Sequence, residues 1–322
     1  MRVLVTGRGS IAKRHVRHLR ELRPDVEFSV VSGSGEVDPV FQPCTVVKTF
    51  DDGLLWKPDA LVIASISSRH AVELERALER ELPCLVEKPL VTDRAQLRQL
   101  SRCVGQHEIP LAIVVGCNLR HLPALAKLRQ EFMRDPALRV LRAHLEVGQE
   151  LTQWRPGRDL KDSYSAFSSQ GGGVVFDLMH EIDMARWLLG PLTLHAATGG
   201  HFSSLPIDSN DVHVALLKTG RGAPVVVSLD YVSRQPVRRY SFVTTAGTFI
   251  VDLMAKTIVL DSSEGHRIIN DMVEDFDIAQ TYQAQMAEWL AAIENPDRYL
   301  TSPLADGLET AALMLDIHEA PV

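Results

Sequence analysis

The sequence contains little cysteine, and none of it is paired in sequence. Its four cysteines, Cys44, Cys84, Cys103 and Cys117, lie far apart and form no C-x-x-C motif. This spacing excludes a disulfide-stabilised small domain. The twelve histidines contain no H-E-x-x-H motif and no Cys/His cluster at zinc spacing. We therefore expect a metal-free protein from a reducing, cytoplasmic compartment.

The sequence also lacks an excess of positive charge and any long apolar run. Its formal net charge is -7, which gives no overall basic field for nucleic acid or an anionic membrane. The apolar run 109–117 is far shorter than the ~20 residues of a membrane span. The apolar stretch in the first residues, MRVLVTG, is too short for a signal peptide. These absences predict no nucleic-acid partner and no membrane association.

Short apolar runs that alternate with amphipathic segments fill the first third of the chain. Strands are predicted over 2–7, 26–32, 60–65, 84–89 and 111–116, with a weaker one at Val46–Val47, and helices over 10–22, 71–80 and 93–107. This alternation is typical of βαβ units, whose parallel sheet is covered on both faces. It predicts an α/β domain over residues 1–118.

The pattern changes after residue 118. Strands separated by glycine-containing turns are predicted at 139–148, 213–220, 223–233, 238–253 and 257–262, and helices at 122–134, 174–188, 279–294 and 303–318. Consecutive strands of this kind favour an antiparallel sheet in an α+β domain. A length of 322 residues agrees with two domains, the second spanning 119–322.

The first predicted strand ends in the pattern G-x-G-x-x-A, at residues 7–12. Gly7 permits a tight turn, Gly9 lets the backbone approach a pyrophosphate, and the small Ala12 allows close packing of helix on strand. Ser10 and Ile11 open the helix, whose N-terminus attracts anions. The pattern predicts a Rossmann domain that binds NAD or NADP. A glycine-rich turn without a ligand is the alternative.

The end of the second predicted strand does not distinguish the two cofactors. Ser32 stands where an NAD-binding enzyme usually has an acid for the ribose hydroxyls, and the first acid after it is Glu36. The segment has no arginine for a 2′-phosphate either. NAD and NADP both remain open.

Six motifs occur in the order of one known family. They read GRGSIAKRH, ASISSRHAVELERALE, LVEKPL, VVGCNLRHLP, WRPGRDLKDSYSA and GGGVVFDLMHEIDMARWLLG. On these motifs the chain resembles the Gfo/Idh/MocA oxidoreductases over nearly its whole length. The resemblance implies a Rossmann domain followed by an α+β domain with an open, mostly antiparallel sheet. That sheet often mediates oligomerisation in the family, which implies a homodimer or homotetramer.

The resemblance also implies residue roles. Lys88 of the E-K-P motif would contact both the nicotinamide ribose and the substrate hydroxyl, and His180 would be the catalytic base, with Asp177 holding the substrate and the histidine. A neutral histidine suits proton removal near pH 7, and a lysine can stabilise the developing alkoxide. The remaining cofactor contacts would come from Ser65, Ile66, His70, Glu87 and Asn118.

The segment predicted as a helix over 174–188 carries Asp177, His180 and Asp183 at i, i+3 and i+6. Successive members of this set are neighbours on a helix and fan over about 120°. An ordinary polar first turn of a helix is the alternative. The D-x-x-H spacing is one residue shorter than the D-x-x-x-H of many family members, which places the role of Asp177 in question.

Substrate-side candidates precede this helix. The loop 149–170 mixes stacking surface with cationic donors in Trp154, Arg155 and Tyr164, a mixture that suits a sugar ring with a charged substituent. A solvated loop anchored by its tryptophan is an equal alternative. Arg120, close after Asn118, and Asp183 complete the substrate-binding prediction.

The sequence thus predicts an NAD(P)-dependent oxidoreductase that acts on a hydroxyl or keto carbon of a sugar, polyol or nucleotide sugar. Two alternatives stay open. One is a hydrolase of the same family that uses tightly held NAD for transient oxidation. The other is a non-catalytic regulator that binds a dinucleotide.

Overall fold

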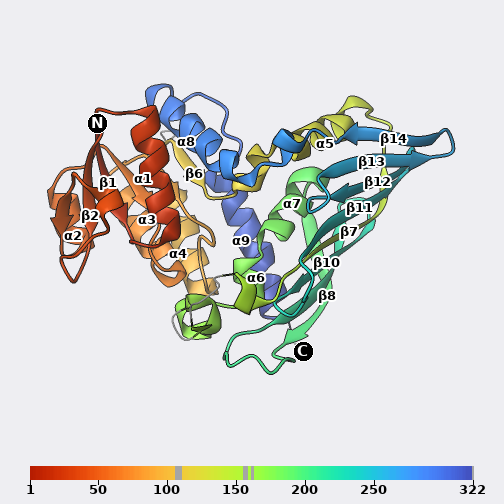
Figure 1. Ribbon diagram of the computed structural model, residues 1–322, viewed down its shortest axis with the longest axis horizontal. Helices are drawn as coiled ribbons and strands as arrows, with labels where there is room; N and C mark the ends of the chain where they lie inside the picture. Colours follow the sequence, from red (N-terminus) through yellow and green to blue (C-terminus); the bar gives the residue numbers. More distant parts are fainter. Residues whose placement is uncertain (106–110, 155–158, 161–162, 321–322) are drawn as a thin grey trace. The chain divides into compact units, whose positions relative to one another are not determined.

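The computed structural model describes residues 1–105, 111–154, 159–160 and 163–320. The chain forms two compact units, which are described separately (Figure 1). Unit 1 comprises Met1–His121 together with Ala279–Ala311, and unit 2 comprises Leu122–Ile278 together with Ala312–Val322.

Unit 1 is built on a parallel sheet of six strands in the order β3-β2-β1-β4-β5-β6. The strands are β1 (Arg2–Thr6), β2 (Glu27–Val31), β3 (Thr45–Val47), β4 (Ala60–Ile63), β5 (Cys84–Val86) and β6 (Ile113–Val115). Every residue of β4 and β5 is buried. Burial on both faces is what parallel sheets require, and it explains why these strands read as continuous apolar runs.

Helices cover both faces of this sheet. The helices of unit 1 are α1 (Ser10–Leu22), α2 (Phe50–Leu55), α3 (His70–Leu78), α4 (Arg94–Val104) and α8 (Ile278–Glu294). Buried residues of α1 and α8, such as Val16 and Trp289, share one apolar core with Val3, Val5 and Val62 of the strands. On the other face, Gly53 of α2 lies against Leu4, where a Cβ would be 2.6 Å from a leucine methyl group.

Helix α8 joins unit 1 although it comes late in the chain. Trp289 is fully buried, and its indole Nε1 donates to the carbonyl oxygen of Ala112 at 3.1 Å. Gln285, also fully buried, donates from Nε2 to the carbonyl oxygen of Val115 at 2.9 Å. The sequence grouped these residues with the second domain. They pack on unit 1 because edge strand β6 offers an apolar surface, and because the carbonyl oxygens of Ala112 and Val115 accept these side-chain donors in addition to backbone N–H groups.

Unit 2 contains an eight-stranded sheet in the order β14-β13-β12-β11-β7-β10-β9-β8. Its strands are β7 (Val140–Gly148), β8 (Leu192–Gly200), β9 (Val212–Thr219), β10 (Pro224–Asp230), β11 (Val237–Thr244), β12 (Gly247–Asp252), β13 (Thr257–Ser262) and β14 (Gly265–Asn270). Among the described strands of this sheet, only the β7–β10 pair is parallel. Helices α5 (Pro123–Arg134), α6 (Val174–Asp177) and α7 (His180–Leu189) pack on this sheet (Figure 1).

The predicted fold class, a Rossmann α/β domain followed by a domain with an open, mostly antiparallel sheet, is confirmed. Strands β8 and β14 and helix α2 were missed by the sequence patterns. Strand β14 is an edge strand whose first four residues are exposed, so it carries no alternating apolar signal. The segment 238–253 forms two strands, β11 and β12, joined by a short turn.

The prediction of a single helix over 174–188 was wrong. Helix α6 ends at Asp177 and α7 begins at His180, and Leu178 between them leaves the helical region with ψ at 21°. The 120° fan of Asp177, His180 and Asp183 therefore does not exist. The break lets Asp177 and Glu181 bind to different strands of the sheet, as described below. α9 (Leu304–His318) ends the described chain, and its residues divide between the two units.

One buried and two partly buried histidines predict a pH-dependent stability. Burial lowers the pKa of His121, His213 and His318 below the ordinary value, although the Glu288 carboxylate opposes the shift at His121 and the carbonyl of Ile317 opposes it at His213. The unfolded chain therefore binds more protons than the folded chain near pH 6.5. Stability should be highest above about pH 6.5 and should fall as the pH drops below it.

The urea midpoint of unfolding at pH 7.5 and 5.5 measures this effect. We expect His213→Leu to reduce the pH dependence, because it removes one depressed pKa. The matched control is His266→Gln, since the side chain of His266 is 60% exposed. Equal midpoints for the unmodified chain at both pH values would contradict the prediction.

Candidate functional site

The turn between β1 and α1 has the backbone that the G-x-G-x-x-A pattern predicts. Gly7 has φ +85°, and a Cβ there would lie 2.1 Å from the carbonyl oxygen of Ala64. Any side chain at Gly7 would therefore be excluded both by conformation and by the neighbouring strand. A Cβ at Gly9 would meet nothing within 4 Å, so the surface above this residue is open. Ala12 is fully buried between helix and sheet.

The N-terminus of α1 suits an anion. Gly9 caps the helix without a side-chain hydrogen bond, and the first turn contains no acidic residue. The first N–H groups of an α-helix have no intrahelical partner, and the helix dipole favours negative charge beside them. Ser10 and Ile11 are the first two residues of this turn. The open glycine, the uncapped helix and the strand-to-helix turn together fit the pyrophosphate of a dinucleotide.

The loop after β2 holds Ser32 at its base. Ser32 is buried, and its hydroxyl donates to the carbonyl oxygen of Glu36 at 2.6 Å. The exposed Arg8, which stands between the two glycines of the turn, reaches the same loop. Its Nη1 donates to the hydroxyl of Ser34 at 2.9 Å and to the carbonyl oxygen of Glu36 at 2.7 Å. Arg8 was not predicted, because no sequence pattern shows that it contacts this loop.

The tip of β5 carries Glu87, Lys88 and Pro89. Glu87 is 7% exposed, and its Oε1 accepts a hydrogen bond from Nε2 of the fully buried His15 at 2.7 Å. Burial alone would raise the pKa of Glu87, but the hydrogen bond and charge of His15, with the charge of Lys88, lower it. The carboxylate is thus held ionised at the carboxyl end of the sheet, and half-buried Lys88 follows it directly.

His15 was missed as a site residue. It lies on the buried face of α1 between Ala12 and Val16, where the periodicity calls for an apolar side chain. This histidine on an apolar helix face was the one sequence signal that could have identified His15 as a site residue. Its partner cannot be found from sequence, since Glu87 is 72 residues away.

His70 links the tips of β4 and β5. It is 2% exposed, with Nδ1 2.8 Å from the carbonyl oxygen of Pro89 and Nε2 3.1 Å from that of Ser65. The hydroxyl of Ser65 donates to Oε2 of Glu73 at 2.9 Å. The side chain of Ile66 is 46% exposed beside them. The structure therefore gathers the predicted residues Ser65, Ile66 and His70 around one strand end.

Asn118 and Arg120 lie in the helical turn Asn118–His121 after β6, and both are buried. Asn118 donates from Nδ2 to the hydroxyl of Thr281 in α8 at 2.7 Å. Nη1 of Arg120 donates to the carbonyl oxygen of Thr301 at 2.9 Å and to the carboxylate of Asp306 at 2.8 Å. These bonds connect the turn with the late segment of unit 1. A substrate contact of Arg120 stays a prediction.

In unit 2, Asp177 is held by a tyrosine of the sheet. Tyr231, which directly follows β10, donates from its hydroxyl to Oδ2 of Asp177 at 2.6 Å. Burial, together with the negative charge of Asp177, raises the pKa of Tyr231 well above its ordinary value. Tyr231 is therefore a permanent donor that orients the carboxylate. Sequence reasoning missed it, since the partners are 54 residues apart.

His180 opens helix α7, which a buried network ties to the sheet. Glu181 is fully buried, and its Oε1 accepts from Nε of Arg238 at 2.6 Å and from the hydroxyl of Tyr240 at 2.8 Å. Asp183, two residues further along, is also fully buried. In the sequence, half-buried His180 lies between Asp177 and Glu181, whose carboxylates accept hydrogen bonds from Tyr231 and from Arg238 and Tyr240.

The loop before this segment is described in part. Trp154 packs edge-to-face on Tyr231, with ring centroids 5.2 Å apart. Tyr164 is close enough for its charge to raise the pKa of Tyr231 further. These two predicted residues therefore gather around the tyrosine that binds Asp177. Arg155 lies outside the described residues.

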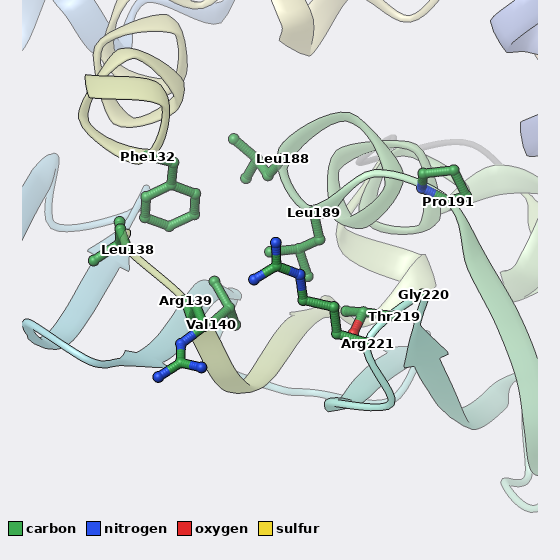
Figure 2. Close-up of a pocket in the computed structure, with 10 residues that line it drawn as sticks. All are labelled: Phe132, Leu138, Arg139, Val140, Leu188, Leu189, Pro191, Thr219, Gly220 and Arg221. Atoms are coloured by element: carbon green, nitrogen blue, oxygen red, sulfur yellow. The ribbon is translucent and has the colours of Figure 1, made fainter. Parts of the chain in front are cut away.

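A pocket of about 320 Å³ lies elsewhere in unit 2 (Figure 2). Phe132, Leu188 and Leu189 form its apolar wall, and Arg139 and Arg221 also line it. None of the predicted site residues lines this pocket. The described residues contain no group of three or more His, Cys, Asp or Glu side chains that could hold a metal ion. No helix in the described part of the chain is long and apolar enough to cross a membrane.

The parallel sheet, the glycine turn and the uncapped helix define a dinucleotide-binding Rossmann domain. Two family profiles support this conclusion. Residues 1–114 match the oxidoreductase family with an NAD-binding Rossmann fold, and residues 140–250 match the GFO/IDH/MocA C-terminal domain. The chain belongs to the Gfo/Idh/MocA oxidoreductase family, which confirms the resemblance found in its motifs.

Curated relatives and solved structures agree with this assignment. The chain is 27% identical to an inositol 2-dehydrogenase of Mycolicibacterium smegmatis, over 97% of this chain and 91% of that protein. It is 28% identical to a myo-inositol dehydrogenase of Streptomyces leeuwenhoekii, over 64% of this chain and 61% of that protein, which is less than two thirds of its length.

The fold is similar to that of the WlbA dehydrogenase from Bordetella pertussis, solved in complex with NADH and UDP-GlcNAcA. The TM-score is 0.81 at 16% identity, and the match covers 99% of this chain and 94% of that one. At this identity the likeness concerns the fold alone.

Proposed function

We propose that the chain is a dehydrogenase or reductase that moves a hydride between a nicotinamide dinucleotide and a CH–OH or keto carbon of a sugar, polyol or nucleotide sugar. Family membership supports the reaction class. The names of the relatives, inositol dehydrogenases and a dehydrogenase solved with a nucleotide sugar, support the substrate class. The feature that carries the proposal is the polar tip of β5, where Glu87 is buried against His15 and Lys88 follows.

The dinucleotide would be held by the glycine turn and the N-terminus of α1, with Ser65, Ile66 and His70 at the end of β4, and Asn118. When bound, it supplies the acceptor or donor of the hydride. Oxidation of an alcohol also requires loss of the hydroxyl proton. In our proposal His180 takes this proton, and the Lys88 ammonium donates a hydrogen bond to the substrate oxygen as its charge develops.

Asp177 would orient His180 and the substrate. Its hydrogen bond from Tyr231 supports this role despite the shortened D-x-x-H spacing. Trp154 and Tyr164, both near Tyr231, offer stacking surface for a sugar ring, and Asp183 and Arg120 would complete the substrate contacts. Assembly into a homodimer or homotetramer through the sheet of unit 2 is part of the same proposal.

A cofactor-reduction screen tests the function. NAD and NADP are each offered with inositols, hexoses and nucleotide sugars, and absorbance of the reduced nicotinamide is followed together with product analysis. We expect net reduction with at least one of these substrates. Glycoside cleavage without net reduction would instead indicate the hydrolase. Dinucleotide binding without any turnover across the screen would favour the regulator.

A further inference from the structure

The loop after β2 and the side chain of Arg8 form a small polar cluster at the surface of unit 1. We define the 2′ cluster as Arg8, Ser32 and Ser34. The Arg8 guanidinium bonds to the hydroxyl of Ser34, whose oxygen lies 3.3 Å from that of Ser32. The second acceptor of Arg8 is the carbonyl oxygen of Glu36, which also accepts from Ser32. The cluster therefore holds an exposed cation and two hydroxyls together.

The position of this cluster beside the sheet indicates which part of a dinucleotide it would meet. Strands β1 and β2 are parallel neighbours, so the glycine turn after β1 and the loop after β2 lie side by side at the carboxyl end of the sheet. In a Rossmann domain the pyrophosphate lies at the first helix, and the adenosine ribose lies at the end of the second strand. An acid at that end binds the 2′-hydroxyl of NAD, whereas an arginine nearby accommodates the 2′-phosphate of NADP.

The two carboxylates of the loop do not replace the missing acid. Asp38 pairs with Lys13 and accepts from the backbone N–H of Val40, and these contacts lower its pKa. Glu36 is exposed, and it is the backbone carbonyl oxygen of Glu36 that accepts the hydrogen bond from Arg8. The surface over the loop is open, because a Cβ at Gly33 or Gly35 would meet nothing within 4 Å.

We propose that the 2′ cluster binds the 2′-phosphate of NADP(H), and that the chain consequently binds NADPH more tightly than NADH. The proposal rests on the dinucleotide binding of the proposed function and adds its cofactor specificity. A guanidinium is always charged and presents several donors in one plane, which matches a phosphate. The exposed hydroxyl of Ser34 can rotate to donate to a phosphate oxygen, and buried Ser32 holds the loop beneath it through its bond to the carbonyl oxygen of Glu36.

Equilibrium binding to the purified chain tests the proposal without turnover. NADPH and NADH are titrated by fluorescence, and 2′,5′-ADP and 5′-AMP by calorimetry, because the last pair differs at the 2′-phosphate and lacks the nicotinamide. We expect NADPH and 2′,5′-ADP to bind more tightly than their counterparts. Arg8→Gln should weaken both by about 10- to 100-fold, the range of a lost charge-assisted contact, and change NADH by less than about twofold.

Two further variants keep the test sharp. Ser34→Asp places a carboxylate beside the phosphate and should weaken NADPH selectively, even if Arg8→Gln disturbs the loop. Glu36→Gln should leave the preference for NADPH unchanged. Thermal unfolding of each variant reports whether the fold is retained.

The outcomes separate this proposal from the function on which it rests. Equal or tighter binding of NADH, an equal effect of Arg8→Gln on both cofactors, or a selective loss of NADH in Glu36→Gln would overturn the 2′ cluster alone. Failure of both NADH and NADPH to bind would overturn the dinucleotide site and this proposal with it.

Discussion

Replacing Lys88 by methionine should lower kcat about 1,000-fold and leave the unfolding temperature almost unchanged. The loss is within the range expected when a donor to a developing charge is removed. Methionine keeps most of the apolar length of the lysine stem, so the half-buried position after β5 stays filled. The neighbouring Glu87 carboxylate keeps its hydrogen bond from His15. The structure at the end of β5 should therefore be retained, while the hydrogen-bond donor to the substrate oxygen is lost.

Steady-state kinetics with the best substrate of the screen measures this effect, and dinucleotide titration measures binding separately. Lys48→Met is the matched control, because Lys48 is an exposed lysine of the same unit. Wild-type activity in the Lys88 variant would contradict the mechanism. A large loss of dinucleotide affinity with unchanged kcat would instead assign Lys88 to cofactor binding alone.

Replacing Glu181 by leucine should destabilise unit 2 by about 3–5 kcal/mol, the usual cost of removing one partner of a buried ion pair. Glu181 is fully buried, and the side chain of Arg238 is 17% exposed. Burial alone would lower the pKa of Arg238, but the Glu181 carboxylate raises it above its ordinary value. Without the carboxylate, Arg238 would keep its charge in a largely dry site, and the hydroxyl of Tyr240 would lose its acceptor.

Urea unfolding followed by circular dichroism gives the free-energy change. The double variant Glu181→Leu/Arg238→Met should recover a large part of the loss, because no unpaired charge remains. Arg239→Met is the control, since Arg239 follows Arg238 in β11 and pairs with Asp252 of β12, but its side chain is 57% exposed. A loss in Glu181→Leu no greater than in this control would mean that the network does not secure α7 to the sheet.

Several features of the fold could be predicted from sequence because they depend on neighbours in the chain. The alternation of apolar strands with helices such as 10–22 is set by local periodicity, and the structure has the helix at those residues. The turn at Gly7 is equally local, since its positive φ is nearly reserved for glycine. Family membership also follows from short motifs read in order.

The candidate site was predicted as a set of residues but not as a set of contacts. Lys88, His180 and Asp177 were identified by motif, and their catalytic roles stay predictions. Three residues that contact the predicted site or its loops were missed: His15, which binds Glu87, Tyr231, which binds Asp177, and Arg8, which binds the loop after β2. Each is an ordinary residue in its own segment and gains its role from a partner that sequence spacing does not reveal.

The sequence by itself determined the alternation of strands and helices in residues 1–118 apart from helix α2, the glycine turn and the family. Only the tertiary structure decided that the segment 174–188 breaks at Leu178, that edge strand β14 forms, and that α8 packs beside β6 in unit 1. The physical reason is the range of the interactions. Periodicity and turn chemistry act over a few residues, whereas Trp289 finds the carbonyl oxygen of Ala112 across 177 residues of chain.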